Sequence, residues 1–254
     1  MDMRISSLHK ALLHPQQIPG MLKRRTRHLQ DVTTTSYRKL YFRLYQLPSI
    51  DIDSVAPPLD EPVDVIMDHI CLPPYLGPST HDDVTPLMRI IKHVKPRVVL
   101  EFGTAHGNTV ANICRSCEAY AFTVNALPEQ LSGQFISYTL SKDEIGCVYR
   151  QHGFANRVTQ IYANTLEFAP LDYIKDADVE LVIIDACHDT EYVVNDFMKA
   201  LKVVNKRAIV LFHDTHPGME NHLVGSYTAC MKLRRRGFDV RHIRDTWWAI
   251  WQKR

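Results

Sequence analysis

The chain has 254 residues, of which 45% are hydrophobic, 9% aromatic and 23% charged, and its formal net charge is +2. This balance is typical of a globular protein and excludes extended disorder, a collagen-like chain and a small disulfide scaffold. No apolar run approaches the roughly 18 residues that a transmembrane segment needs. We find no secretory signal, so we expect reduced cysteines and a cytoplasmic protein.

Charge is distributed unevenly along the chain. Residues 1–50 hold nine Lys or Arg and two Asp, a formal charge of +7, which leaves −5 for residues 51–254. Such a basic arm suits contact with anionic lipid, nucleic acid or an acidic partner, and a solvated helix face is an equally good interpretation. We predict that residues 1–70 are a basic helical extension followed by a proline-rich segment.

Helix and strand patterns alternate from residue 82 onward. The predicted helices span 82–95, 108–117, 141–152, 189–204 and 223–236, and the predicted strands span 98–102, 119–124, 158–162, 181–185, 208–212, 238–241 and 247–251. Strands separated by helices indicate parallel βαβ units, whereas the short connection before the last strand favours antiparallel pairing. Residues 71–254 are therefore predicted to be an α/β, doubly wound, Rossmann-like sheet, mostly parallel, with an antiparallel C-terminal hairpin.

The turn after the first of these strands carries the strongest functional signal. It reads Glu101-Phe-Gly-Thr-Ala-His-Gly-Asn-Thr109. Glycines at the end of a parallel strand let a ligand approach the backbone, and the next helix offers free N–H groups. A dinucleotide fingerprint needs glycine at positions 103, 105 and 108, where this chain has Gly103, Ala105 and Asn108. A nicotinamide-dependent dehydrogenase is therefore disfavoured.

This turn resembles the first motif of class I S-adenosylmethionine-dependent methyltransferases. The resemblance implies S-adenosyl-L-methionine as cofactor, with Glu101 serving its ammonium group. In that family the second strand ends in an acid that binds the ribose hydroxyls, and Asn125 stands there instead. Asn164 and Thr165 fall where the family contacts the adenine. The cofactor-binding residues implied are Glu101, Gly103, Thr104, Ala105, Gly107, Asn108, Thr109, Asn125, Asn164, Thr165 and Asp185.

Two later segments resemble a family of small-molecule O-methyltransferases that includes enzymes acting on macrolide sugars. They are Ile184-Asp-Ala-Cys-His-Asp-Thr-Glu191, with Asp196 further on, and His213-Asp214. Thr190 replaces the tyrosine that is usual in this pattern. The resemblance implies a hydroxylated small-molecule or glycosyl acceptor.

An aliphatic hydroxyl is too weak an acid to ionise unaided, so methyl transfer to it needs a cation or a base. Asp185 and Asp214 follow two successive parallel strands, at the edge where such sheets bind ligands. We predict that both hold Mg²⁺, although Asp185 could instead cap the next helix. His188 is the predicted general base, with an imidazole pKa suited to neutral pH, and His213 is its competitor. The predicted catalytic residues are thus His188, Asp185 and Asp214.

Two other functions stay open at this stage. One keeps the cofactor but methylates RNA or another macromolecule, although no aromatic and basic RNA-binding signature is present. The other is a non-catalytic partner subunit that binds the cofactor, which the departures at Asn125 and Thr190 allow. For residues 1–70, a lid, a contact in a homo-oligomer and a peripheral membrane-surface helix are all open.

Overall fold

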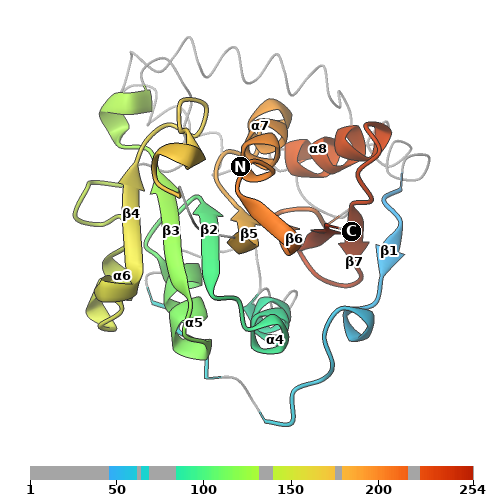
Figure 1. The fold of residues 1–254 in the computed structure, drawn as a ribbon, viewed down its shortest axis with the longest axis horizontal. Coiled ribbons are helices and arrows are strands. Elements are labelled where there is room, and N and C mark those ends of the chain that lie inside the picture. The colour runs from blue at the N-terminus through green and yellow to red at the C-terminus, as the bar shows by residue number, and fades with distance from the viewer. Residues whose placement is uncertain are drawn as a thin grey trace, which may run out of the picture.

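The computed structural model describes residues 46–61, 64–68, 84–131, 140–174, 179–216 and 224–253. The helices predicted for the basic extension fall before residue 46 and lie outside these ranges. Within them, one sheet has the strand order β1-β7-β8-β6-β5-β2-β3-β4 (Figure 1). The strands are β1 (Ser49–Ile50), β2 (Val98–Phe102), β3 (Tyr120–Asn125), β4 (Val158–Tyr162), β5 (Val179–Ile184), β6 (Val204–Phe212), β7 (Arg241–Ile243) and β8 (Ala249–Gln252).

The directions of the strands confirm the predicted topology. Strands β6, β5, β2, β3 and β4 are parallel neighbours, and β8 pairs antiparallel with both β6 and β7. From β2 the chain adds β3 and β4 on one side, and it then adds β5 and β6 on the other side. The boundary between β2 and β5 is therefore the topological switch point, where doubly wound sheets bind ligands. The site is therefore expected at the carboxyl ends of these central strands.

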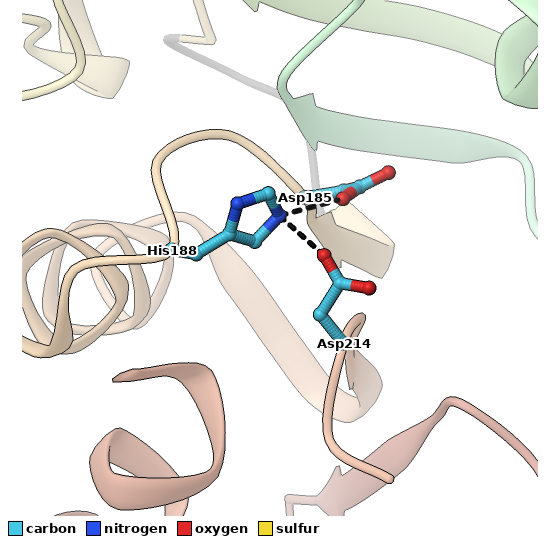
Figure 2. A group of neighbouring side chains, drawn as sticks. All are labelled: Asp185, His188 and Asp214. Carbon is cyan, nitrogen blue, oxygen red and sulfur yellow. Dashed lines mark ion pairs between the residues drawn. The ribbon is translucent and has the colours of Figure 1, made fainter. Parts of the chain in front are cut away.

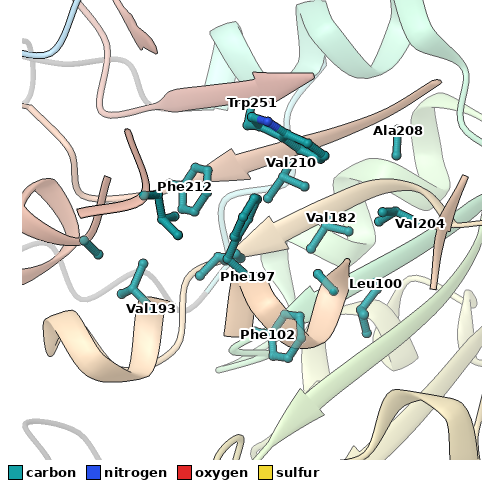
Figure 3. Packing of buried hydrophobic residues seen from close by; sticks show 14 of the residues in the cluster. Leu100, Phe102, Val182, Val193, Phe197, Val204, Ala208, Val210, Phe212 and Trp251 are labelled. Carbon is teal, nitrogen blue, oxygen red and sulfur yellow. The ribbon is translucent and has the colours of Figure 1, made fainter. Parts of the chain in front are cut away.

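Helices cover both faces of the sheet. On one face lie α4 (Val84–Val94), α5 (Asn108–Ser116) and α6 (Cys147–Gln151), and on the other lie α7 (Thr190–Ala200) and α8 (Val224–Arg235) (Figure 1). Side chains alternate between the faces along each strand, so two apolar cores form. Figure 3 shows the core beneath α7 and α8, where Phe197 packs edge-on against Trp251 with ring centroids 5.2 Å apart.

Two of the predicted helices are shorter than expected. The helix predicted over 141–152 shrinks to α6, because Gly146 immediately before it has a positive φ of 71°. The helix predicted over 189–204 ends at Ala200, since β6 already begins at Val204. Within the described ranges no helix is both long and apolar enough to cross a membrane.

The described part of the proline-rich segment packs on the sheet. β1 pairs in parallel with β7, and the amide of Leu47 donates to the hydroxyl of Tyr227, 2.8 Å away, on α8. Further on, Asn112 on α5 bonds both the amide and the carbonyl of Ile66, each at 2.8 Å. These contacts join residues 46–61 and 64–68 to the same cores as the rest of the sheet.

Candidate active site

Polar side chains meet where β5 and β6 end. Asp185 directly follows β5, and its amide donates to the carbonyl of Phe102 at the end of β2, 2.8 Å away. Asp214 follows β6 by two residues and has a positive φ of 56°, a conformation that is uncommon outside glycine. His188 lies between β5 and α7, and Figure 2 shows its imidazole directed toward both carboxylates.

The structure brings the three predicted catalytic residues together. The Nε2 atom of His188 forms an ion pair with Asp214 and lies 3.8 Å from Oδ1 of Asp185 (Figure 2). One potential ligand atom from each residue lies within 4.8 Å of the others. The side chains of Asp185 and His188 are 29% and 23% exposed, whereas the Nε2 atom of His188 is itself buried against the two acids.

His213 completes the cluster from the same loop as Asp214. Its Nδ1 atom lies 3.0 Å from Oδ1 of Asp185 and 3.4 Å from Oδ1 of Asp214. Two carboxylates thus face two imidazoles. This arrangement leaves His213 in contact with both acids, as befits an orienting residue.

The charges in the cluster shift one another's protonation. Burial alone would lower the pKa of His188, but the carboxylates of Asp214 and Asp185 outweigh it and raise the pKa to about 9. Burial alone would raise the pKa of Asp214, but the imidazoles of His213 and His188 hold it far below its usual range. The carboxylates thus move the pKa of His188 above the neutral range expected from the sequence, which favours the protonated imidazole.

Asp185 is not the cap of the following helix. The residue at the N-terminal boundary of α7 is Asp189, four residues further on. The alternative role considered for Asp185 thus fails on position. Its carboxylate is left to the cluster with His213 and His188.

The glycine-rich turn lies against this cluster. A Cβ atom on Gly103 would lie 2.1 Å from the backbone oxygen of Asp185, and one on Gly107 would lie 2.8 Å from the ring of Tyr149 on α6. Both glycines have positive φ, 100° and 89°. Both glycines are therefore needed for close packing, and Gly103 places the turn in contact with Asp185.

A row of buried and half-buried polar side chains runs from the turn beneath α5 and α6. Glu101, Thr123 and Gln160 are register partners on β2, β3 and β4. The hydroxyl of Thr123 donates to one carboxyl oxygen of Glu101, and the hydroxyl of Thr104 lies 2.6 Å from that of Thr123 and accepts from Gln160 at 3.0 Å. The side chain of Thr104 is thus engaged within this row, and its carbonyl accepts from the amide of Gly107 at 2.8 Å.

Glu101 is fully buried within this row. Its second carboxyl oxygen, Oε1, has no hydrogen-bond partner among the described residues. Burial raises the pKa of Glu101 well above its usual range, the hydrogen bond from Thr123 opposes this, and the charge of Asp185 adds to it. Among the described residues, no positive charge contributes to the shift of this pKa.

The amides predicted to contact the cofactor make internal contacts. Asn125 accepts from the amide of Ala105 at 3.0 Å, and Asn108 pairs with the backbone of Asp68 through both of its side-chain atoms. Asn164 accepts from the amide of Leu166 at 3.0 Å. Asn125 thus holds the turn in shape, a role that its end-of-strand position alone did not reveal. Thr109 lies in the first turn of α5, and Thr165 is buried beside Asn164. Like every other cofactor contact implied by the sequence, theirs stay predictions.

Sequence reasoning missed the position of Trp247. This residue was expected within the last strand, but β8 begins two residues later, at Ala249. Its ring lies nearly parallel to those of His213 and His216, with both centroids 6.3 Å away. Trp248 and Trp251 pack into opposite cores, as their alternation predicts.

Comparison with known proteins identifies the domain. Residues 100–215 match a family described as a methyltransferase domain. This range runs from β2, through the glycine-rich turn, to the loop that holds His213 and Asp214. The chain contains an S-adenosylmethionine-dependent methyltransferase domain. No curated protein matches this sequence.

Solved structures share the fold of this methyltransferase. One is cofactor-bound Rv0187 from MTB, with a TM-score of 0.51 and 20% identity over 66% of this chain and 78% of that one. Another, from Staphylococcus aureus and provisionally described as a caffeoyl-CoA O-methyltransferase, has a TM-score of 0.51 and 13% identity over 92% of this chain and 100% of that one. The O-methyltransferase NovP has a TM-score of 0.50 and 12% identity over 66% and 79%. At these identities the likeness establishes the fold alone.

Proposed function

We propose that this methyltransferase transfers a methyl group from S-adenosyl-L-methionine to a hydroxyl of a small molecule or a glycosyl group, with the help of a divalent cation. The observation that supports this acceptor chemistry is the Asp185, His188 and Asp214 cluster. Carboxylate oxygens suit Mg²⁺ or Mn²⁺, and an imidazole that has lost its proton to the incoming cation can join them for Mn²⁺. The donor set therefore fits a divalent cation, with Asp185 and Asp214 as its principal ligands.

The residues near Gly103 fit the cofactor. The unpartnered oxygen of Glu101 can accept a hydrogen bond from an ammonium group, and Glu101 stands two residues before Gly103. A cation bound beside this carboxyl would lower its raised pKa and favour the charged form. Because Gly103 contacts the backbone of Asp185, a cofactor on this turn and an acceptor at the cluster would be neighbours. Proximity of this kind is the main contribution that a methyltransferase makes to an in-line displacement.

The reaction forms a bond between the acceptor oxygen and the methyl carbon while the bond from that carbon to sulfur breaks. S-adenosylhomocysteine leaves, and the hydroxyl proton must be removed. A bound divalent cation would make a coordinated hydroxyl more acidic. Asp185 and Asp214 hold the acceptor region in place, and His213 orients both carboxylates. His188 can take the proton only once its own proton has been lost, because the two acids keep it protonated in this structure.

The test is methyl transfer from labelled S-adenosylmethionine to a panel of sugars, phenols and transcribed RNA, with Mg²⁺ or with EDTA. We expect transfer to a hydroxylated small molecule that EDTA suppresses. Asp185→Asn and Asp214→Asn should each lower turnover at least about 100-fold. The matched control is Asp53→Asn, since the Asp53 side chain is 70% exposed and pairs with Arg89 instead.

Each part of the proposal has its own contradicting result. Full activity in EDTA would overturn the role of the cation but not the methyl transfer. Transfer to RNA alone would replace the small-molecule acceptor. An inactive protein that binds S-adenosylhomocysteine but methylates no member of the panel would favour a non-catalytic partner subunit.

A further inference from the structure

Helix α8 approaches the loop of His188 more closely than any side chain would permit. Gly225 lies in the first turn of α8, and a Cβ atom there would lie 2.0 Å from the backbone oxygen of His188 and 3.0 Å from the amide nitrogen of Thr190. Both of these are backbone atoms, which cannot rotate away as a flexible side chain can. Only glycine allows this contact.

A buried hydrogen bond also joins the start of α7 to the start of α8. The hydroxyl of Thr190, the first residue of α7, donates to the carbonyl of Gly225 at 3.1 Å. Thr190 is 6% exposed, so water does not compete for the donor. The threonine that departs from the usual motif is therefore the residue that ties α7 to α8.

His188 needs such a support more than its partners do. Asp185 and the residue before Asp214 are held by the sheet, because the amide of Asp185 bonds Phe102 and the amide of His213 bonds the carbonyl of Ile184 at 3.1 Å. His188 lies beyond the end of β5 and before α7, so the position of its backbone depends on what packs against the loop. Gly225 packs there directly.

We propose that Thr190 and Gly225 are positioning residues that fix His188 against Asp214 and Asp185. They act through the backbone of His188 and touch neither cofactor nor acceptor. The inference deepens the proposed function, because it rests on the role given there to the cluster. Loss of the hydrogen bond from Thr190, or of the close packing at Gly225, is expected to move the imidazole of His188, while the glycine-rich turn at Gly103 stays in place.

The test compares Thr190→Val, which keeps the volume but removes the donor, with Thr190→Ser, which keeps the donor. The readout is the imidazole N–H proton of His188 in the NMR spectrum of the full chain, identified by its loss in His188→Asn. We expect the wild-type resonance to persist in Thr190→Ser and to shift or disappear in Thr190→Val and Gly225→Ala. Thr246→Val, which removes another buried donor to a carbonyl, is the matched control.

A second readout is the binding of Mn²⁺ and of S-adenosylhomocysteine by calorimetry. Loss of a residue that orients a metal ligand commonly weakens metal binding 10- to 100-fold. We therefore expect Thr190→Val to weaken Mn²⁺ binding about tenfold, with cofactor-product affinity within about twofold of wild type. Thr190→Ser should restore the metal affinity.

An unchanged His188 resonance in Thr190→Val would overturn the inference and leave the contact a merely structural one. Absence of that resonance from the wild type would overturn it as well, because the pair with Asp214 would not exist. If the wild type binds no Mn²⁺, the cation in the proposed function fails, and the NMR comparison still decides the positioning role. If Gly225→Ala does not fold, the Thr190 pair decides alone.

Discussion

At the scale of single residues, the glycine-rich turn is constrained by its neighbours as much as by a ligand. Gly103 and Gly153 both have positive φ, 100° and 79°. A Cβ atom on Gly103 would strike the backbone of Asp185, whereas one on Gly153 would meet nothing within 4 Å. An alanine at position 153 thus changes stability through backbone conformation alone. An alanine at position 103 adds a steric clash to the same conformational cost.

We predict that Gly153→Ala lowers the free energy of unfolding by about 1 kcal/mol, the usual cost of a left-handed conformation. Gly103→Ala should lower it by about 3 kcal/mol or more, since the clash adds to that cost. Urea unfolding measures both. Equal losses in the two variants would mean that the contact between Gly103 and Asp185 does not constrain the fold.

Glu101 is the residue at which stability and binding oppose each other. Its folded-state pKa is raised, so the folded state holds a proton that the unfolded state releases, and its contribution to stability declines as the pH rises through the folded pKa. Glu101→Gln should therefore increase the free energy of unfolding at pH 8. The same variant should weaken S-adenosylhomocysteine binding at least about tenfold, the usual loss for a hydrogen bond to a charged group.

The control ligand for this variant is methylthioadenosine, which has no ammonium group and whose affinity should not change. Two results would contradict this role of Glu101. One is a Glu101→Gln protein that is less stable than wild type at pH 8, and the other is an equal loss of affinity for S-adenosylhomocysteine and methylthioadenosine.

At the scale of elements, α5 holds a distant segment through two amides one helical turn apart. Asn112 pairs with both backbone groups of Ile66, and Asn108 pairs with both backbone groups of Asp68. Residues 66 and 68 lie two apart, as in one face of a strand. Helix α5 thus takes the place of a neighbouring strand for this segment. One of the two amides, Asn108, directly follows Gly107 of the glycine-rich turn.

Asn112→Ala should free two buried backbone groups at Ile66, at a cost of about 2 kcal/mol. Hydrogen exchange of the Ile66 amide should become faster, with the amides of β5 unaffected. The control is Asn205→Ala, whose side chain bonds the amide of Arg207 at the start of β6. Unchanged exchange at Ile66 would show that the two amides do not hold this segment.

The elements also show what the sequence could and could not predict. Strands and helices from β2 to β8 were predicted because apolar periodicity is local, and the cluster of Asp185, His188 and Asp214 followed from the rule that parallel strands end at one edge. The pairing of β1 with β7 and the contact of Gly225 with His188 depend on segments that are distant in sequence. The row from Glu101 to Gln160 depends on strand register, which periodicity does not reveal.

At the scale of the whole molecule, one buried histidine links the fold to pH. Burial lowers the pKa of His242 on β7 to about 4, the imidazole of His216 lowers it as well, and Asp245 acts in the opposite direction. Below about pH 6.5 the unfolded chain takes up a proton at His242 that the folded chain does not. Stability is therefore lost as the pH falls from about 6.5 to about 4.

The loss should amount to about 1.4 kcal/mol per pH unit at most. Urea unfolding of the wild type and of His242→Asn between pH 7.5 and pH 4.5 measures it. The wild type should lose stability relative to the variant as the pH falls. Parallel stability curves for the two proteins would contradict a neutral, buried His242.

We expect a cofactor turn and a cation cluster to operate side by side at the ends of β2, β5 and β6. Calorimetric titration of the full chain with S-adenosylhomocysteine, with and without Mg²⁺ or Mn²⁺, tests this most directly. We expect micromolar binding in both conditions, and cation binding that Asp214→Asn abolishes while the affinity for S-adenosylhomocysteine is kept. No binding of S-adenosylhomocysteine in either condition would contradict it.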